Sequence, residues 1–154
     1  MSECKKNGFI AENLQELNTL DDTIQNLIRQ ATKAREFAYC PYSKFKVGSA
    51  VLCDDGTIYT GCNIENSAFS GGICAERSAY SNAISQGKRK FKAVAVIAHQ
   101  EKKFTPPCGV CRQFMSEFGN VDVYISKPAA EDVLCLNLDQ LLPLQFETTN
   151  QQFI

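Results

Sequence analysis

The chain has 154 residues, of which 44% are hydrophobic and 21% are charged, and its formal net charge at pH 7 is −1. This length suffices for one domain with a hydrophobic core, and the composition is typical of a soluble globular protein. The near-neutral charge argues against a nucleic-acid partner or an anionic membrane surface, and no apolar stretch approaches the length of a membrane span.

Eight cysteines are many for a chain of this size. A disulfide framework is one interpretation, but the chain exceeds the usual size of disulfide-stapled domains, and residues 1–20 contain no apolar segment of a secretory signal. We therefore expect a reducing compartment, the cytoplasm, with Cys40, Cys53, Cys62 and Cys135 as reduced residues of the core.

Residues 1–20 have no clear hydrophobic periodicity, which predicts a flexible N-terminal extension. A single domain over residues 21–154 is expected to follow it. At the start of this domain, apolar residues recur at 3.6-residue spacing over about 22–38 and predict an amphipathic helix. Its apolar stripe is expected to pack on a sheet.

Two strands are predicted next, over 46–53 and 57–62. The segment Asp54-Asp55-Gly56 between them has the composition of a hairpin turn. Residues 63–72 have no regular period, which predicts a long loop. Loops of this length often bind a ligand.

The second half of the chain alternates helices and strands. Small apolar residues predict a helix over about 75–86, and the continuous apolar run 93–98 predicts a central strand covered on both faces. The remaining predicted elements are a short helix over 110–118, strands over 121–125 and 132–137, and a helical turn over 139–142. The order α-β-β-α-β-α-β-β implies an α/β fold with a mixed sheet and helices on both faces.

Three cysteines stand at the predicted starts of two helices. Cys74 precedes the helix over 75–86, and Cys108 and Cys111 open the next helix as a Cys-x-x-Cys pair. Such a pair alone also fits a redox motif or half of a structural zinc site. With Cys74 as the third ligand, the fourth position on a zinc ion is left for water, as in catalytic zinc sites. The positive end of each helix dipole favours the thiolate form of these cysteines.

Glu76 lies two residues after Cys74, in the first turn, where both side chains can project past the helix end into one site. It is placed to take a proton from the water and not to bind the metal. The alternative is an exposed glutamate favoured by the helix dipole. Arg77 and Arg112 lie within a turn of the ligands, and we expect them to hydrogen-bond the sulfurs. The alternative for each arginine is a surface salt bridge.

The combination of Cys74-Ala75-Glu76-Arg77 with Pro107-Cys108-Gly109-Val110-Cys111-Arg112-Gln113 resembles the cytidine deaminase family, small homotetrameric zinc type. The resemblance runs from about Ala38 to Phe146. It implies a three-layer α/β/α sandwich with a mixed five-stranded sheet, and one Zn²⁺ per chain on Cys74, Cys108 and Cys111. His99, the only histidine, lies outside the motif.

The resemblance implies hydrolytic deamination of cytidine and 2′-deoxycytidine, with release of ammonia. Glu76 would move the proton from water to N3 of the ring and then to the departing amine. The implied substrate contacts within one chain are Phe45 with the base, Asn63 and Glu65 with the ribose 3′-hydroxyl, and the Ala75 N–H with the 2-carbonyl. Neighbouring subunits are implied to complete the site, with Ser67, Ala68 and Phe69 near the ribose of an adjacent site and Phe146 reaching over the base. Ser67 and Phe69 stand where some members carry Ala and Tyr. From the residues alone, the three phenylalanines would be assigned to the core.

Other functions fit parts of the same pattern. A deaminase of a modified cytosine nucleoside, such as blasticidin S, would use the same zinc site. A zinc-binding interaction protein without activity would not need Glu76 beside an open ligand position. Deaminases of nucleotides or polynucleotides typically use a histidine ligand and need phosphate contacts, and neither is evident in the sequence.

Overall fold

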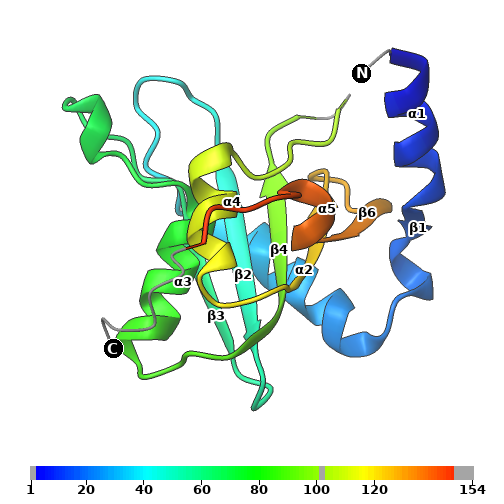
Figure 1. Ribbon diagram of the computed structural model, residues 1–154. Coiled ribbons are helices and arrows are strands. Elements are labelled where there is room, and N and C mark those ends of the chain that lie inside the picture. The colour runs from blue at the N-terminus through cyan, green and yellow to red at the C-terminus, as the bar shows by residue number, and fades with distance from the viewer. Residues whose placement is uncertain (1–2, 101–102, 148–154) are drawn as a thin grey trace.

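The computed structural model describes residues 3–100 and 103–147. These residues form one mixed sheet of six strands with helices on both faces (Figure 1). The strands are β1 (Leu14–Glu16), β2 (Val47–Cys53), β3 (Ile58–Cys62), β4 (Phe91–Ala98), β5 (Asp122–Ser126) and β6 (Asp132–Asn137). The helices are α1 (Glu3–Glu12), α2 (Asp22–Arg35), α3 (Ala75–Ser85), α4 (Gly109–Ser116) and α5 (Leu138–Leu141), with 3-10 turns η1 (Leu17–Thr19) and η2 (Phe69–Gly71).

Across the sheet the strands follow the order β1-β6-β5-β4-β2-β3. β4 and β5 are parallel, and every other neighbouring pair is antiparallel. β4 is buried along almost its whole length, as expected for an apolar strand covered on both faces. β2 and β3 form the predicted hairpin. Its turn contains Gly56 at φ +86°, a left-handed conformation that glycine adopts without strain.

Helix α2 covers one face of the sheet. It begins after Asp21, whose carboxylate accepts hydrogen bonds from the backbone N–H groups of Thr23 (2.9 Å) and Ile24 (3.1 Å). This cap satisfies N–H groups that the first helical turn leaves without partners. The buried residues of this layer are Ile24, Leu27, Ile28 and Ala31 of the helix and Ala50, Leu52, Ala93, Ala95, Ile97 and Val133 of the sheet.

Helices α3, α4 and α5 cover the opposite face. Tyr80 of α3, Met115 of α4 and Leu138 of α5 are fully buried there against β4 and β5. Four aromatic rings lie in this layer with centroids 4.6 to 6.2 Å apart: Tyr80, Phe91, Phe114 and Phe118. Their tilted and edge-on contacts are those that aromatic pairs prefer. The two helical layers with the sheet between them confirm the predicted three-layer arrangement.

Two glycines let helices lie close to the sheet. A Cβ atom at Gly48 of β2 would lie 2.1 Å from the carbonyl oxygen of Ala31 in α2, and one at Gly61 of β3 would lie 2.2 Å from the amide nitrogen of Ala79 in α3. Both neighbours are backbone atoms, so a larger residue would push the whole helix away. Gly61 therefore fixes how near α3 lies to the sheet.

The N-terminal residues differ from the flexible extension predicted over residues 1–20. In the part that is described, α1 is helical and β1 adds a sixth strand to the sheet by pairing with β6. The pairing continues past the strand, because the Cys135 N–H donates to the Asn13 carbonyl and the Leu17 N–H to the Glu131 carbonyl, both at 2.9 Å. The prediction of five strands is therefore wrong by one. A three-residue strand held by backbone bonds has too short a side-chain pattern to be recognised in a sequence.

The other elements lie within a few residues of their predicted bounds. The largest difference is at α2, which was predicted to continue to residue 38 and ends at Arg35. Residues 36–38 continue as turns, with backbone hydrogen bonds to carbonyl groups three residues earlier. These bonds satisfy the last carbonyl groups of the helix.

Seven cysteines are described, and each is a free thiol. Cys40 and Cys53 are buried and Cys62 and Cys135 are partly buried, which agrees with their prediction as reduced interior residues. Burial raises the pKa of Cys53 and of Cys62, and raises that of Cys135 to about 11, so these thiols stay protonated. Among the residues described, no helix has both the length and the apolar character needed to span a bilayer.

Candidate active site

The starts of α3 and α4 bring three thiols together. Cys74 is the N-cap residue of α3, Cys108 is the N-cap residue of α4, and Cys111 follows in the first turn of α4. The three sulfur atoms lie within 4.8 Å of one another, and those of Cys74 and Cys108 are 3.8 Å apart. Neither N-cap side chain bonds to its own helix. Both are therefore free to face the other thiols.

The three sulfurs fit a zinc ion. Zinc–sulfur bonds are about 2.3 Å long, so two sulfurs on a tetrahedral ion lie about 3.8 Å apart. The distance between Cys74 and Cys108 has this value. Three protein ligands leave the fourth position of a tetrahedral ion to water or substrate. The cysteines predicted as ligands thus form one group that can hold a metal.

The thiols also change one another's acidity. The pKa of Cys74 falls to about 5, chiefly because the Cys111 thiol hydrogen-bonds to it, with further contributions from Arg77 and Cys108. The pKa of Cys111 is raised by this interaction with Cys74 and by burial. Cys74 is therefore a thiolate at neutral pH, which is the form that binds metal ions.

Glu76 lies in the first turn of α3 beside this group, and only 4% of it is exposed. Burial raises its pKa, and the charge on Cys74 raises it further. The exposed glutamate considered from the sequence is therefore wrong. A carboxyl group with a raised pKa holds a proton more readily than a free one, which suits a group that must both take and return a proton in general acid/base catalysis.

Arg77 lies next to the thiols, as predicted. Its guanidinium interacts with Cys74 and Cys111, and these interactions help to lower the pKa of Cys74. It also donates a hydrogen bond of 3.4 Å to the carbonyl oxygen of Gly72, two residues before Cys74. A fixed positive charge here offsets part of the negative charge that three thiolates bring to a zinc site.

Arg112 has different partners from those predicted. Its guanidinium donates to the carbonyl oxygens of Pro107 (2.7 Å) and Leu141 (2.6 Å). It therefore ties the start of α4 to the end of α5, and no sulfur is among its hydrogen-bond partners in the described structure. A long side chain in the first helical turn can reach either kind of acceptor, and its position in the sequence does not decide which.

Cys74, Glu76 and Cys108 line a cleft of about 670 Å³. Five residues predicted to contact substrate also line it: Phe45, Asn63, Glu65, Phe69 and Ala75. The cleft has two walls. We call the first turns of α3 and α4 the metal wall, and residues 42–47 together with residues 63–66 the turn wall.

Asn63 holds the turn wall through its side-chain amide. The amide oxygen accepts the backbone N–H of Val47, and the amide nitrogen donates to the carbonyl oxygen of Phe45, both at 2.8 Å. Glu65 accepts hydrogen bonds from the backbone N–H groups of Tyr42 and Ser43 and from the Ser43 hydroxyl. These bonds lower the pKa of Glu65, with the Ser43 hydroxyl as the largest cause.

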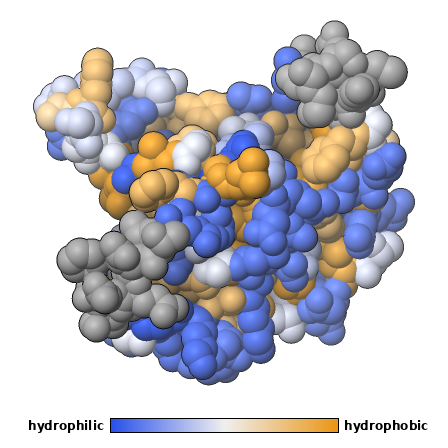
Figure 2. Space-filling view, viewed as in Figure 1, coloured by the Kyte–Doolittle hydropathy of each residue, from blue (hydrophilic) through white to orange (hydrophobic). Residues whose placement is uncertain are grey.

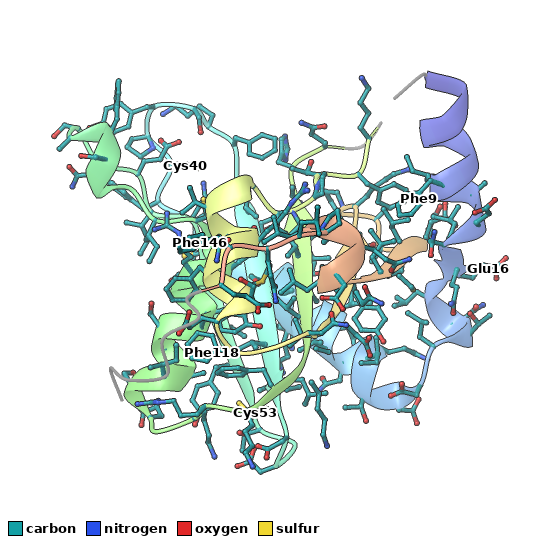
Figure 3. All side chains as sticks on the ribbon, in the orientation of Figure 1. Phe9, Glu16, Cys40, Cys53, Phe118 and Phe146 are labelled. Atoms are coloured by element: carbon teal, nitrogen blue, oxygen red, sulfur yellow. The ribbon has the colours of Figure 1, made fainter. Side chains whose placement is uncertain are left out.

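Ser67, Ala68 and Phe146, which were predicted to contact substrate in the site of a neighbouring subunit, are not among the residues that line the cleft of their own chain. Phe146 lies beside α4 (Figure 3), where its backbone bonds to the Gln113 side chain at 2.9 and 3.2 Å. Its side chain is 74% exposed, and that of Phe69 is 87% exposed. These two were not the core residues that the sequence alone suggested. Apolar side chains reach the surface on the face that carries α4 (Figure 2).

Several cleft residues were missed from the sequence, among them Tyr42, Ser43 and Thr105. Ile64 and Ile73 were missed as well, and they pair through two backbone hydrogen bonds of 2.9 Å. This pairing brings residues 63–66 alongside Cys74. Ser43 lies within the stretch that resembles the deaminase family and two residues before Phe45, so its segment was identified without its role. The pairing of Ile64 with Ile73 has no local sequence signal, because a loop brings the two together.

Comparison with known proteins agrees with this geometry. Residues 21–127 match the family model of the cytidine and deoxycytidylate deaminase zinc-binding region. The chain belongs to this family. It is 50% identical over 125 residues to a cytidine deaminase of Sporosarcina psychrophila, covering 80% of this chain and 90% of that protein. It is 43% identical to a probable cytidine deaminase of Dictyostelium discoideum, covering 70% of this chain and 73% of that protein.

Solved structures of the family have the same fold. The crystal structure of cytidine deaminase from Burkholderia pseudomallei matches with a TM-score of 0.74 and 40% identity, covering 79% of this chain and 97% of that chain. The structure of the Mycobacterium tuberculosis enzyme matches with a TM-score of 0.69 and 35% identity, covering 83% and 100%. The family match begins at residue 21, after α1 and β1.

Proposed function

We propose that the protein is a zinc-dependent cytidine deaminase that converts cytidine and 2′-deoxycytidine to uridine and 2′-deoxyuridine. The observation that carries this proposal is the buried Glu76 carboxyl group beside three clustered thiols in a cleft. The names of the relatives support the same reaction. A zinc-binding protein without activity would have no need for a buried carboxyl group at this position, since burying one costs free energy.

Cys74, Cys108 and Cys111 would hold the zinc ion, which makes bound water acidic and polarises the group under attack. Glu76 takes the proton of the attacking water and delivers it to N3 of the cytosine ring. It then takes the second proton from the hydroxyl group now on C4 and gives it to the amine, so that the C4=O bond forms as the C4–N bond breaks and ammonia leaves. The raised pKa of Glu76 suits it to carry the proton in both directions.

The turn wall would bind the nucleoside. We infer that Phe45 packs against the base and that Glu65 accepts a hydrogen bond from the ribose 3′-hydroxyl, with Asn63 beside it. The N–H of Ala75, at the start of α3, would donate to the 2-carbonyl of the base. All four residues line the cleft, which supports this assignment.

Neighbouring subunits would complete the site in a homotetramer. Phe69 and Phe146 carry this part of the proposal, because both are large, apolar and mostly exposed. Ser67 and Ala68 belong to the same exposed segment as Phe69 and would contact the ribose of an adjacent site. We also propose that residues 21–154 form one deaminase domain and that the enzyme works in the cytoplasm.

Turnover of three compounds tests the function. Zinc-loaded protein is given cytidine, 2′-deoxycytidine or blasticidin S, and ammonia release is measured for each. The proposal predicts release from at least one of the two nucleosides at a kcat/KM well above that for blasticidin S. Preference for blasticidin S would favour the modified-nucleoside alternative. Absence of release from all three, with zinc bound, would contradict the enzyme assignment.

A further inference from the structure

The turn that carries Phe45 contains a residue in an unfavourable conformation. Lys44 has φ +57°, in the left-handed region that residues with a side chain adopt at a cost in free energy. Its N–H donates to the carbonyl oxygen of Cys40 at 3.1 Å, which closes the turn. Figure 3 labels Cys40 in this part of the molecule. Such a conformation persists only where the surrounding structure holds it.

One hydroxyl group holds the residues on both sides of Lys44. The Ser43 Oγ accepts the backbone N–H of Phe45 at 3.0 Å and donates its proton to Oε1 of Glu65. A hydroxyl has a single proton, so its donation to the carboxylate leaves its lone pairs to accept from Phe45. Ser43 therefore connects the Glu65 carboxylate directly to the backbone of Phe45.

Glu65 holds the same turn with its second oxygen. Oε2 accepts the N–H groups of Tyr42 at 2.9 Å and of Ser43 at 3.2 Å. A carboxylate has about four acceptor positions, and the turn occupies three of them. The remaining position, on Oε1, is available to a donor in the cleft, and the Ser43 hydroxyl shares that oxygen. The direction in which Oε1 can accept from a ligand therefore depends on Ser43.

Phe45 is fixed from its other side as well. Its carbonyl oxygen accepts the Asn63 amide at 2.8 Å, so both backbone polar groups of Phe45 bond to side chains. The Asn63 segment continues to Ile64, which pairs with Ile73 next to the thiol Cys74. The position of Phe45 is thus set relative to the metal wall through a continuous series of hydrogen bonds.

We propose that Ser43 is a positioning residue for substrate binding, which acts through Glu65 and the backbone of Phe45. This inference rests on the proposed function, in which these two residues contact the nucleoside. Removal of the hydroxyl leaves the Phe45 N–H without its acceptor and Oε1 of Glu65 without its donor. In the part of the chain that the structure describes, the hydrogen bonds of Ser43 go to Glu65 and Phe45 and none goes to the thiols or Glu76, so the groups proposed for the chemical step are unchanged.

The first test compares Ser43→Ala with Ser43→Thr, which keeps a hydroxyl at the same position. Loss of a hydrogen bond to a charged group weakens binding about tenfold or more. Ser43→Ala is expected to raise KM for cytidine about tenfold with kcat changed less than about threefold, and Ser43→Thr to restore most of the loss. An equal fall in kcat and kcat/KM, or a Ser43→Thr variant as impaired as Ser43→Ala, would overturn the proposal.

A double-mutant cycle with Glu65→Gln tests whether Ser43 acts through Glu65. Ser43→Ala is expected to cost about tenfold in kcat/KM alone and less than about twofold when Glu65→Gln is already present. If Glu65→Gln turns over too slowly to measure, uridine affinity by calorimetry gives the same cycle. Additive effects would show that Ser43 does not work through Glu65.

Hydrogen exchange separates this inference from the proposed function. The Phe45 amide should exchange faster in Ser43→Ala than in the parent protein, and at the parent rate in Ser43→Thr. This result does not require turnover. If the parent protein deaminates neither cytidine nor 2′-deoxycytidine, the proposed function fails, and unchanged Phe45 exchange in Ser43→Ala would independently overturn the role of Ser43.

Discussion

The metal wall and the turn wall face the same cleft but are built differently. In the metal wall, side chains project from the first turns of two helices that pack on the sheet, and Glu76 and Cys111 are 4% and 0% exposed. Cys74 is partly buried and Cys108 is exposed at the cleft. In the turn wall, no residue is fully buried, and the residues are held by hydrogen bonds between side chains and backbone. The reacting groups are therefore fixed by packing, and the groups that select substrate are fixed by a polar network. Disruption of the metal wall should abolish the reaction. Disruption of the turn wall should weaken substrate binding by an amount that depends on the hydrogen bond removed.

The largest effect is expected from removal of a metal ligand. Cys108→Ala should lose bound zinc and all measurable activity, because two thiols and a water hold the ion much more weakly than three thiols. Zinc per chain is measured by atomic absorption after gel filtration. Cys135→Ala is the control, because Cys135 is not one of the three clustered thiols, and this variant should keep one zinc per chain. A Cys108→Ala protein that also keeps one zinc would show that the ligand assignment is wrong.

The next largest effect is expected from Glu76→Gln, which keeps the shape of the side chain and removes its proton transfer. Activity should fall by at least the roughly 10²–10⁴-fold typical of a general acid or base, with zinc still bound. Kinetics with cytidine and zinc analysis of the same sample measure both. Glu36→Gln at the protein surface serves as the control and should retain activity. Near-normal turnover by zinc-replete Glu76→Gln would refute the assignment.

Gly61→Ala tests whether packing positions the metal wall. The added Cβ would lie 2.2 Å from the backbone of α3, and overpacking of this kind costs about 1–3 kcal/mol of stability. Thermal unfolding should report this loss, and zinc affinity should fall because Cys74 starts the displaced helix. Gly8→Ala, where nothing lies within 4 Å, is the matched control. Unchanged stability and zinc affinity in Gly61→Ala would mean that α3 does not depend on this close approach.

The smallest expected effect is a change with pH in the stability of the folded protein, caused by the burial of Glu76. It is measured by thermal unfolding with zinc removed and the thiols reduced. The pKa of Glu76 is raised above its ordinary value of 4.5. As the pH rises from about that value, the unfolded chain releases this proton first, so the parent loses stability until the pH passes the raised pKa of the folded protein. Glu76→Gln has no proton to release, so the melting temperature of the parent should fall relative to that of Glu76→Gln as the pH rises from 4 to 8. A parent that instead gains stability relative to Glu76→Gln over this range would show that folding lowers the pKa of Glu76.

The metal wall could be predicted from the sequence because its groups occur at fixed spacing where helices begin. Cys74, Glu76, Cys108 and Cys111 all lie within one or two turns of a recognisable helix start, and local geometry determines where they point. The burial of Glu76 could not be predicted, because it depends on the packing of α3 against the sheet. The partners of Arg112 depend on α5, which follows 26 residues after it in the sequence.

The turn wall was located but not explained by its sequence. The resemblance to the family identified Phe45, Asn63 and Glu65, yet their hydrogen bonds join segments about 20 residues apart, and no sequence periodicity indicates such pairs. The N-terminal strand was missed for a related reason. β1 is specified by backbone bonds to β6, more than 100 residues later in the chain, and its three side chains carry no pattern of their own.

A zinc titration would test the central claim most directly. Zinc is removed with a chelator and added back in steps, and each sample is measured for zinc per chain and for ammonia released from cytidine. We predict that activity is lost when zinc is removed and returns in proportion to bound zinc, up to one ion per chain. Ammonia release that persists without zinc, or full zinc loading on Cys74, Cys108 and Cys111 without any release, would contradict it.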